Sequence, residues 1–388
     1  MERPKARRRC YELAFESDSD EENVIRRPRW IKERANEFDD LDNIDFITKY
    51  RLSKRTVLCV LELIEHKLEF PSDKNDCVSP INQLLCALRF YATGCYQSVS
   101  GDLSGFSTAT AHRIVHRVSC AIASIREHFL RFPETPEEIK ENQLQFHKIA
   151  KFPRVVGAID CTHIRFGKCP NAEDGEVFRN RKNFFSLNVQ AICNANLEML
   201  DIVARWPGST HDSFIFNNSL IKTNFENGRY GDALLVGDSG YGCKNYLITP
   251  LENCVTPADH LFNESQIRTR NPIERMFGVW KRRFPAMALG LRLNLENSFP
   301  VIVATAVLHN VAQQSREVIP RDDEAVVLPA PWDVLIAEGD IRAPLINVGG
   351  PQRGNVNFRV RHSLVTNYFH RLAQREVENA VGAFENGE

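Results

Sequence analysis

The sequence predicts a mixed α/β domain that follows an all-helical segment. Two apolar runs, 155–159 and 234–236, have the nearly continuous hydrophobicity of strands that are buried on both faces. Two further apolar segments, 186–193 and 199–206, also have the pattern of strands. Residues 46–132 show helical periodicity instead. Strands that alternate with helices after a helical segment indicate a mixed α/β order.

The composition limits the possible classes of protein. A chain of 388 residues exceeds the usual size of one core, so we expect two domains plus tails. Hydrophobic residues make up 43% and charged residues 26%, as in ordinary globular proteins. The net charge of −1 gives no general attraction to nucleic acid, so such binding would need local basic patches. No apolar stretch is long enough to span a bilayer, and we expect no membrane partner.

The cysteines and the polar start of the chain indicate an intracellular protein. The eleven cysteines are scattered without a Cys-x-x-Cys pair, so a zinc site is not supported and we expect reduced thiols. Residues 1–45 contain a basic, an acidic and a second basic block, which predicts a disordered charged arm. A nuclear import signal or a DNA-contacting arm is the alternative reading of the basic blocks.

The helical segment 46–132 offers two readings. Ser107 is a plausible N-cap for a helix that begins at Thr108. On that helix the side chains that lie off the apolar stripe include Arg113, His116 and Arg117, which could meet phosphates or base edges. The segment therefore predicts either a helix-turn-helix or a plain bundle with a solvated basic face, and the sequence alone leaves both open.

Residues 133–153 are acidic and bounded by prolines, so we expect a linker with one short helix. The second domain is then expected over 154–320, and residues 321–388 form an extension without an assigned role. Within this domain the segment 209–221 has a helical pattern, with Ser209 or Thr210 as its cap.

Four acidic residues have settings that suit a cation site. Asp160 and Asp238 each follow one of the apolar strand runs, where an unpaired carboxylate is costly to bury. Glu274 lies on the last predicted helix, and Asp212 lies near the start of the 209–221 helix. Hard oxygen ligands of this kind suit Mg²⁺ or Mn²⁺. Two such ions about 4 Å apart can activate a water or a 3′-hydroxyl in phosphodiester displacement.

The motifs around these carboxylates resemble a known family. Four segments in order are similar to the Harbinger (PIF/Harbinger) transposase-derived nucleases of the DDE endonuclease superfamily: 157–164 (GAIDCTHI), 207–213 (PGSTHDS), 237–241 (GDSGY) and 273–284 (IERMFGVWKRRF). The helical segment 83–118 also resembles the helix-turn-helix region of the family, and the resemblance covers about residues 46–320.

The resemblance implies an RNase H-like fold with Asp160, Asp238 and Glu274 as the catalytic, metal-binding triad. It implies Asp212 as a further metal ligand, and action on DNA in the nucleus, with the cytoplasm as a second location. A separate Myb/SANT-like DNA-binding protein is an implied partner, and a homo-oligomer is possible. Cys161 and Gly242 depart from the glycine and the proline usual in the family, but neither departure removes a ligand.

Each site residue also has an ordinary structural reading. Asp160 could be a hydrogen-bonded buried anion, and Asp238 could start a turn. Glu274 could complete a capping box with Asn271, if Pro272 opens the last helix rather than kinking a longer one that begins near Asn263. Asp212 could interact with a helix dipole.

The histidines and basic side chains near the motifs also have ordinary structural readings. His163 and His211 are interpreted as packed or hydrogen-bonded imidazoles, because histidine matches an oxygen-rich Mg²⁺ site poorly. Lys281 and Arg282 are either phosphate contacts or part of a solvated face.

Two functions agree with these motifs and residues. The first is a metal-dependent DNA endonuclease, and the second is a DNA-binding or partner-binding protein of transposon origin with an inactive nuclease site. The presence of all four carboxylates favours the first, because clustered like charges are costly to keep without a function.

Overall fold

The computed structural model describes residues 37–70, 77–95, 107–167, 175–319 and 358–374, together with Gly105 and Cys169. All of these residues belong to one compact unit. Its helices, in chain order, are α2 (Glu37–Asp40), α3 (Asn43–Tyr50), α4 (Lys54–Leu68), α5 (Pro80–Thr93), α7 (Thr108–Ser124), α8 (Arg126–Phe129), α9 (Pro136–Ala150), the 3₁₀ turn η2 (Gly175–Phe178), α10 (Asp212–Asn217), α11 (Leu220–Glu226), α12 (Pro257–Arg283), α13 (Ala286–Leu289), α14 (Leu295–Gln314), α16 (Arg359–Ser363) and the π-helical η4 (Leu364–Phe369).

The strands form one five-stranded sheet with the order β3-β2-β1-β4-β5 in the described part of the chain. Its strands are β1 (Val155–Arg165), β2 (Ser186–Cys193), β3 (Met199–Pro207), β4 (Leu234–Val236) and β5 (Leu247–Ile248). The first three pair antiparallel, whereas β4 pairs parallel to β1 and β5 parallel to β4. The predicted mixed α/β class is therefore confirmed.

Alternating residues of β1 contribute to two separate apolar clusters. Ala158 and Ile164 belong to the cluster that includes the apolar side chains of α12. Ile159 belongs to the second cluster, together with apolar residues of α10 and α11. A register shift between Val155 and Gly157 interrupts the pairing with β4 just before these positions. From Ala158 onward, even-numbered positions of β1 face α12 and odd-numbered positions face α10.

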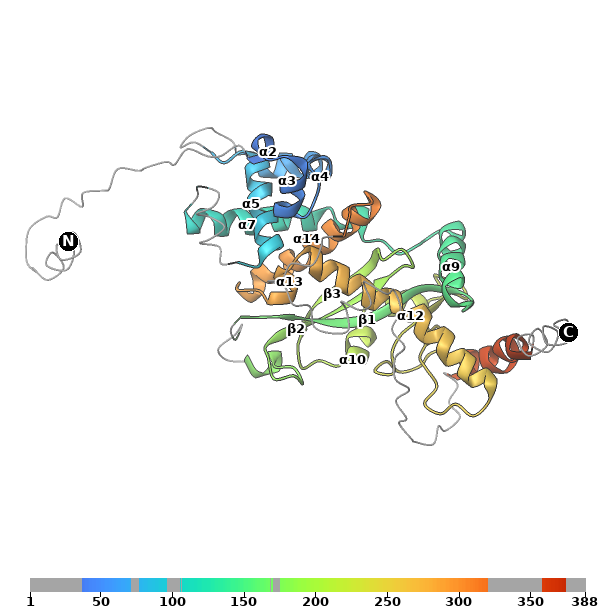
Figure 1. Cartoon of the computed structure of the whole chain (residues 1–388). Helices are drawn as coiled ribbons and strands as arrows, with labels where there is room; N and C mark the ends of the chain where they lie inside the picture. The colour runs from blue at the N-terminus through green and yellow to red at the C-terminus, as the bar shows by residue number, and fades with distance from the viewer. Residues whose placement is uncertain are drawn as a thin grey trace, which may run out of the picture. The chain divides into compact units, whose positions relative to one another are not determined.

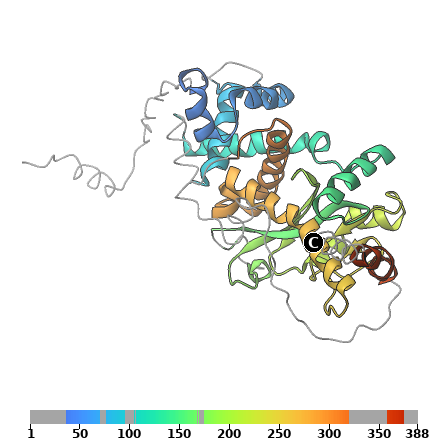
Figure 2. The same ribbon diagram turned by 45° about the vertical axis from the view of Figure 1, so that its right-hand side comes forward.

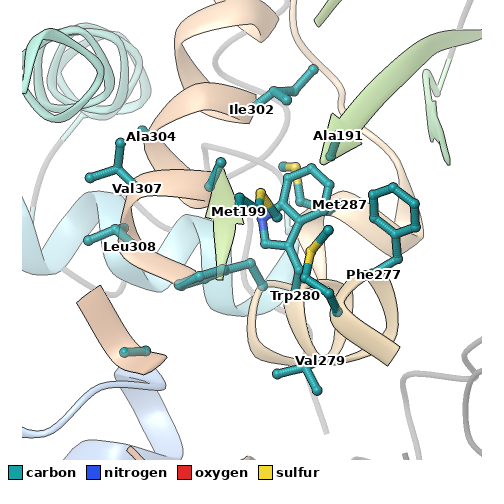
Figure 3. Close-up of a cluster of buried hydrophobic side chains, with 14 of the residues drawn as sticks. Ala191, Met199, Phe277, Val279, Trp280, Met287, Ile302, Ala304, Val307 and Leu308 are labelled. Atoms are coloured by element: carbon teal, nitrogen blue, oxygen red, sulfur yellow. The ribbon is translucent and has the colours of Figure 1, made fainter. Parts of the chain in front are cut away.

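Helix α12 packs against β1, β2 and β4 and carries the centre of the larger cluster. Figure 3 shows side chains from β2, β3, α13 and α14 gathered around Trp280, which is fully buried. Ile273, Phe277, Trp280 and Phe284 recur at helical spacing and are all buried, as expected for a helix with one face in the core.

Helix α14 connects the helical part of the chain to the sheet. It contacts α7 and α8 on one side and β3 on the other (Figures 1 and 2). Asn310 of α14 is fully buried and accepts from the Met199 backbone N–H at 2.8 Å. Its amide nitrogen donates to the carbonyls of Met199, at 2.7 Å, and Phe129, at 2.8 Å. One side chain therefore satisfies buried backbone groups of β3 and α8.

Several local expectations differ from the structure. The expected single helix over 209–221 is wrong, because α10 begins at Asp212 with His211 as its N-cap and the chain starts a second helix, α11, after Ser219. The expected end of β1 at Asp160 is also wrong, since β1 continues to Arg165 against β2. Helix α9 is longer than the short helix expected in residues 133–153, and it packs against β1 and α12.

One further expectation is confirmed, and others stay predictions. Ser107 caps α7 as expected, accepting from the Thr110 backbone N–H. Residues 96–104, which would form most of the turn of a helix-turn-helix, lie outside the described residues, as do residues 1–36 and most of 321–388. The division into a helical domain over 46–132, a linker over 133–153 and a nuclease domain over 154–320 therefore stays a prediction. Within the described ranges, no helix is long and apolar enough to cross a bilayer.

The contacts of Asn310 give a test of the junction between α14 and the sheet. We expect Asn310→Ala to lower the free energy of unfolding by about 2–4 kcal/mol, because buried groups of Met199 and Phe129 lose their partners. Chemical denaturation measures this change. Gln313→Ala on the same helix is the control, since the Gln313 side chain makes an exposed contact, and its effect should stay within about 0.5 kcal/mol. Equal effects of both changes would contradict the role of Asn310.

Candidate active site

The pairing of β1 with β4 brings Asp160 and Asp238 to the same level of the sheet. The last registered pair between these parallel strands is Ala158 with Val236. Asp160 and Asp238 each lie two residues beyond that pair, where β1 continues and β4 has ended. Gly237 is closely packed there, since a Cβ would lie 3.1 Å from Tyr241 and 3.2 Å from Ile159.

Backbone groups hold both aspartates. Asp160 Oδ1 accepts from the Cys161 backbone N–H at 2.7 Å. Asp238 Oδ1 accepts from the Gly240 backbone N–H at 3.0 Å, so Asp238 does start a turn as one reading proposed. Both side chains therefore have a fixed direction before any ligand is present.

Glu274 reaches the same place from the middle of α12. This helix begins at Pro257 with a capping box between Thr256 and Asp259, so the reading of Glu274 as a helix cap is wrong. Pro272 lies inside the helix, which also begins well before the expected start near Asn263.

Arg270 joins the helix carboxylate to the strand carboxylate. Its Nη2 lies 2.7 Å from Glu274 Oε1, one turn further along α12, and its Nη1 lies 3.2 Å from Asp160 Oδ2. The three side chains are only 13–21% exposed. Charged hydrogen bonds in such a partly buried place are strong and directional.

The electrostatics of this cluster show an excess of negative charge. Burial raises the pKa of Asp160 to about 8 against the opposing effect of Arg270, and the charges of Asp238 and Glu274 add to the rise. Burial also raises the pKa of Asp238, with Arg270 again opposing and the charge of Asp212 adding. A single guanidinium therefore does not compensate the carboxylates.

Asp212 lies on the other face of the sheet from Asp160. Its Oδ1 accepts from the Asn188 amide at 2.8 Å, and its charge contributes to raising the pKa of Cys161 after burial. Cys161 and Asn188 both lie on the α10 face, because β1 pairs Cys161 with Gln190 and His163 with Asn188. Asp212 is the first residue of α10, so interaction with the helix dipole accounts for its position without a metal.

A cavity of about 190 Å³ is lined by Asp212 and by the two histidines of the motifs, His163 and His211. His163 Nδ1 lies 3.1 Å from Ser186 Oγ, and burial lowers the pKa of His163 to about 4, so its ring is neutral. His211 Nδ1 lies 2.6 Å from Arg181 Nη2. Both imidazoles are hydrogen-bonded, in agreement with the ordinary reading. Arg181 and Lys182 line the same cavity and are exposed.

The basic residues at the end of α12 have different environments. Lys281 is buried, and its Nζ donates to Thr162 Oγ1 at 2.7 Å and to the His163 carbonyl at 3.0 Å. The reading of Lys281 as part of a solvated face is therefore wrong. Arg282 is half-buried.

On α7, the three residues predicted to bind DNA also have different environments. Arg113 and His116 are exposed. Arg117 instead donates to the carbonyls of Lys67 and Glu69 at the C-terminal end of α4, at 2.7–3.1 Å, and stacks on Phe70. These contacts give Arg117 a structural role, since they satisfy carbonyls that a helix end leaves open.

The donor set fits a hard divalent cation, although the described residues hold no ready-made group of three such ligands around one point. Asp160, Asp238 and Glu274 supply carboxylate oxygens, and the excess of negative charge around them favours the binding of a cation. The neutral thiol of Cys161, whose pKa burial raises, and the neutral His163 add no competing soft ligand.

Comparison with known proteins identifies the family of this chain. The family model of the DDE superfamily endonucleases matches residues 159–310, which contain all four carboxylates. The human protein named "Putative nuclease HARBI1" is 32% identical over 277 residues, which cover 71% of this chain and 79% of that protein. The chain belongs to the DDE superfamily of endonucleases. This confirms the resemblance to the Harbinger transposase-derived nucleases.

More distant relatives of this chain include a plant protein. The Arabidopsis thaliana protein named "Protein ALP1-like" is 25% identical over 286 residues, covering 69% of this chain and 70% of that protein. The cattle protein with the HARBI1 name is 31% identical over 277 residues, which cover 71% of this chain and 79% of that protein. No solved structure matches the chain.

Sequence reasoning missed Arg270 and the basic pair Arg181 and Lys182. The spacing of Arg270 and Glu274 was visible, but an i, i+4 pair on a helix is common on solvated faces. Arg181 and Lys182 lie in a loop that carries no periodic pattern, so only the fold brings them near Asp212.

The buried Lys281 gives a prediction of pH dependence. Burial lowers its pKa from the usual 10.5 to about 7, so between these values the unfolded chain binds more protons at this site than the folded chain. The contribution of Lys281 to stability should therefore rise as the pH rises from about 7 towards 10. Thermal melts of the wild type and Lys281→Met at several pH values measure this. A difference in melting temperature between the two proteins that stays constant from pH 7 to 10 would contradict the assignment.

Proposed function

We propose that this DDE endonuclease cleaves phosphodiester bonds of DNA with the help of divalent cations, Mg²⁺ or Mn²⁺, bound at Asp160, Asp238 and Glu274. The observation that carries the proposal is the convergence of these carboxylates from β1, the end of β4 and α12 on one partly buried place with excess negative charge. A pair of such cations would supply activation of the attacking oxygen and stabilisation of the leaving oxygen.

The protein contributes fixed ligands and a low dielectric. Asp160 and Asp238 are held by backbone N–H groups, and Glu274 is fixed by a helix that packs along the sheet. Ligands that need little rearrangement lose little free energy when they bind a cation. Asp212 interacts with Asp238 from the α10 face, and we keep it as an additional ligand in this proposal.

The fold supports further parts of the proposal. Three antiparallel strands followed by two parallel strands, in the order β3-β2-β1-β4-β5, support an RNase H-like assignment. The contact between α5 and α7 agrees with the helix-turn-helix reading, and the exposed Arg113 and His116 of α7 agree with both this reading and the plain bundle. Action in the nucleus and the cytoplasm, and a Myb/SANT-like partner or a homo-oligomer, remain part of the proposal on the basis of the family resemblance.

A DNA-binding or partner-binding protein with an inactive nuclease site is the second candidate. The ion pairs of Arg270 with Asp160 and Glu274 are the observation that favours it, because they show how the carboxylates can be stabilised without any cation. Direct measurement of DNA cleavage separates the two candidates.

We expect the purified protein to nick supercoiled plasmid in Mg²⁺ or Mn²⁺ and to be inactive in EDTA. Glu274→Gln and Asp238→Asn should lower nicking by orders of magnitude, because an amide is a much poorer ligand for a hard cation than a carboxylate. Gel analysis of plasmid forms measures the rate, and thermal melts in EDTA check that both variants fold.

Matched controls make this test specific. Glu264→Gln changes an exposed glutamate of the same helix that pairs with Arg268, and it should leave nicking unchanged. Ca²⁺ tolerates looser coordination, so it should bind without supporting cleavage. Full nicking activity in Glu274→Gln would remove Glu274 from the cation site. Plasmid that stays intact with the folded wild type would favour the inactive DNA-binding protein.

The positions of the basic residues predict where DNA phosphates are contacted. We expect the double change of Arg181 and Lys182 to Ala to flatten the dependence of DNA affinity on salt by about two units of slope, and Arg113→Ala by about one unit. Fluorescence anisotropy with labelled duplex DNA at several salt concentrations measures both. Arg126→Ala is the control, because Arg126 is exposed and pairs with Glu127. If the substitutions at one of these surfaces change the salt slope no more than Arg126→Ala does, that surface is not part of the DNA interface.

A further inference from the structure

One cation of the chain already occupies the centre of the carboxylate cluster. Arg270 contacts Asp160 on β1 and Glu274 on α12 through two different nitrogens, at 3.2 and 2.7 Å. The Oδ1 atom of Asp160 accepts from the Cys161 backbone N–H. Both oxygens of Asp160 therefore already accept a charged or backbone donor, and a cation that used this carboxylate would compete with Arg270.

The stability of α12 alone does not explain this arginine. An acidic residue that precedes a basic residue by four positions matches the helix dipole, and the reverse order is less favourable. Glu264 and Arg268 of α12 have the favourable order and lie at the surface. Arg270 and Glu274 have the reverse order and are largely buried. The second pair therefore gains little from the helix and owes its position to the carboxylate of Asp160.

Arg270 compensates the charge of the cluster only in part, and one of its own donors is unsatisfied among the described residues. Its Nε is buried and has no acceptor within the described part of the chain. Its one charge faces the carboxylates of Asp160, Glu274 and Asp238, all of which interact with it. With Arg270 as its counterion, the buried cluster keeps an excess of negative charge and one unsatisfied donor. A divalent cation can therefore replace Arg270 as the counterion.

We propose that Arg270 takes the place of a divalent cation in the metal-free protein and must release Asp160 and Glu274 before a cation can bind both. This inference rests on the cation site proposed above. It makes Arg270 a positioning residue that keeps the carboxylates together at low cation concentration and weakens cation binding by competition. A purely supporting residue would have the opposite effect, because its loss would weaken cation binding.

The test measures cation binding without DNA and without turnover. Isothermal titration with Mn²⁺ gives the affinity of the wild type and of Arg270→Gln, and thermal melts in EDTA and in saturating Mn²⁺ give the stabilisation by the cation. We expect Arg270→Gln to melt lower in EDTA, to bind Mn²⁺ at least about tenfold more tightly and to gain more in melting temperature from Mn²⁺. Arg268→Gln is the matched control on the same helix and should behave as the wild type.

The outcomes separate this inference from the proposed function. Equal or weaker Mn²⁺ binding in Arg270→Gln, with a wild type that binds Mn²⁺, would overturn the competition and leave the cation site intact. Absence of Mn²⁺ binding in both folded proteins would overturn the inference together with the cation site. If Arg270→Gln does not fold in EDTA, Arg270→Lys replaces it. The single ammonium of lysine cannot contact both carboxylates through two nitrogens, so Arg270→Lys should bind Mn²⁺ more tightly than the wild type. A Mn²⁺ affinity of Arg270→Lys equal to or below that of the wild type would overturn the competition.

Discussion

The cost of burying carboxylates of like charge is the constraint around which this structure is arranged. Asp160 lies within β1, at the level where the parallel strand β4 has ended, and Asp238 lies just after β4; both side chains are partly buried. Burial raises the pKa of both carboxyls, because it disfavours their charged forms. The arrangement is tolerable because α12 brings a guanidinium to the same place. The helix that adds a third carboxylate thus also supplies the counterion.

Helix α12 is suited to this role because its remaining side chains fix it on several sides. Trp280 anchors it in the apolar cluster of Figure 3. Beyond it, the fully buried Arg283 donates to the carbonyls of Arg51, Glu317 and Val318 at 3.0–3.3 Å. The position of Glu274 therefore depends on contacts with the helical part of the chain. Substitutions near Arg51 can disturb the site without contacting it.

The sequence was sufficient for the parts of the site that follow from local pattern. Apolar runs predicted β1 and β4, and a carboxylate after each run pointed to Asp160 and Asp238. The face on which a residue lies was not predictable in the same way. A single register shift near Gly157 decides that Asp160 faces α12 and Cys161 faces α10, and this shift depends on pairing with β4 rather than on β1 itself. Arg270 was missed because burial, which distinguishes it from Arg268, is a property of the fold.

The division of the site between two faces of the sheet gives Asp238 a special position. Asp160 and Glu274 approach from the α12 face, whereas Asp212 approaches from the α10 face beside Cys161. Asp238 interacts with both groups, because it lies in the turn after β4 and not within a strand. The Cys161 Sγ lies 3.3 Å from the Tyr241 hydroxyl, within hydrogen-bond distance, and burial raises the thiol pKa, so this side chain occupies the α10 side without adding charge. Cys161 therefore contributes to the packing beside Asp212, whereas the carboxylates of Asp160 and Glu274 lie on the α12 face.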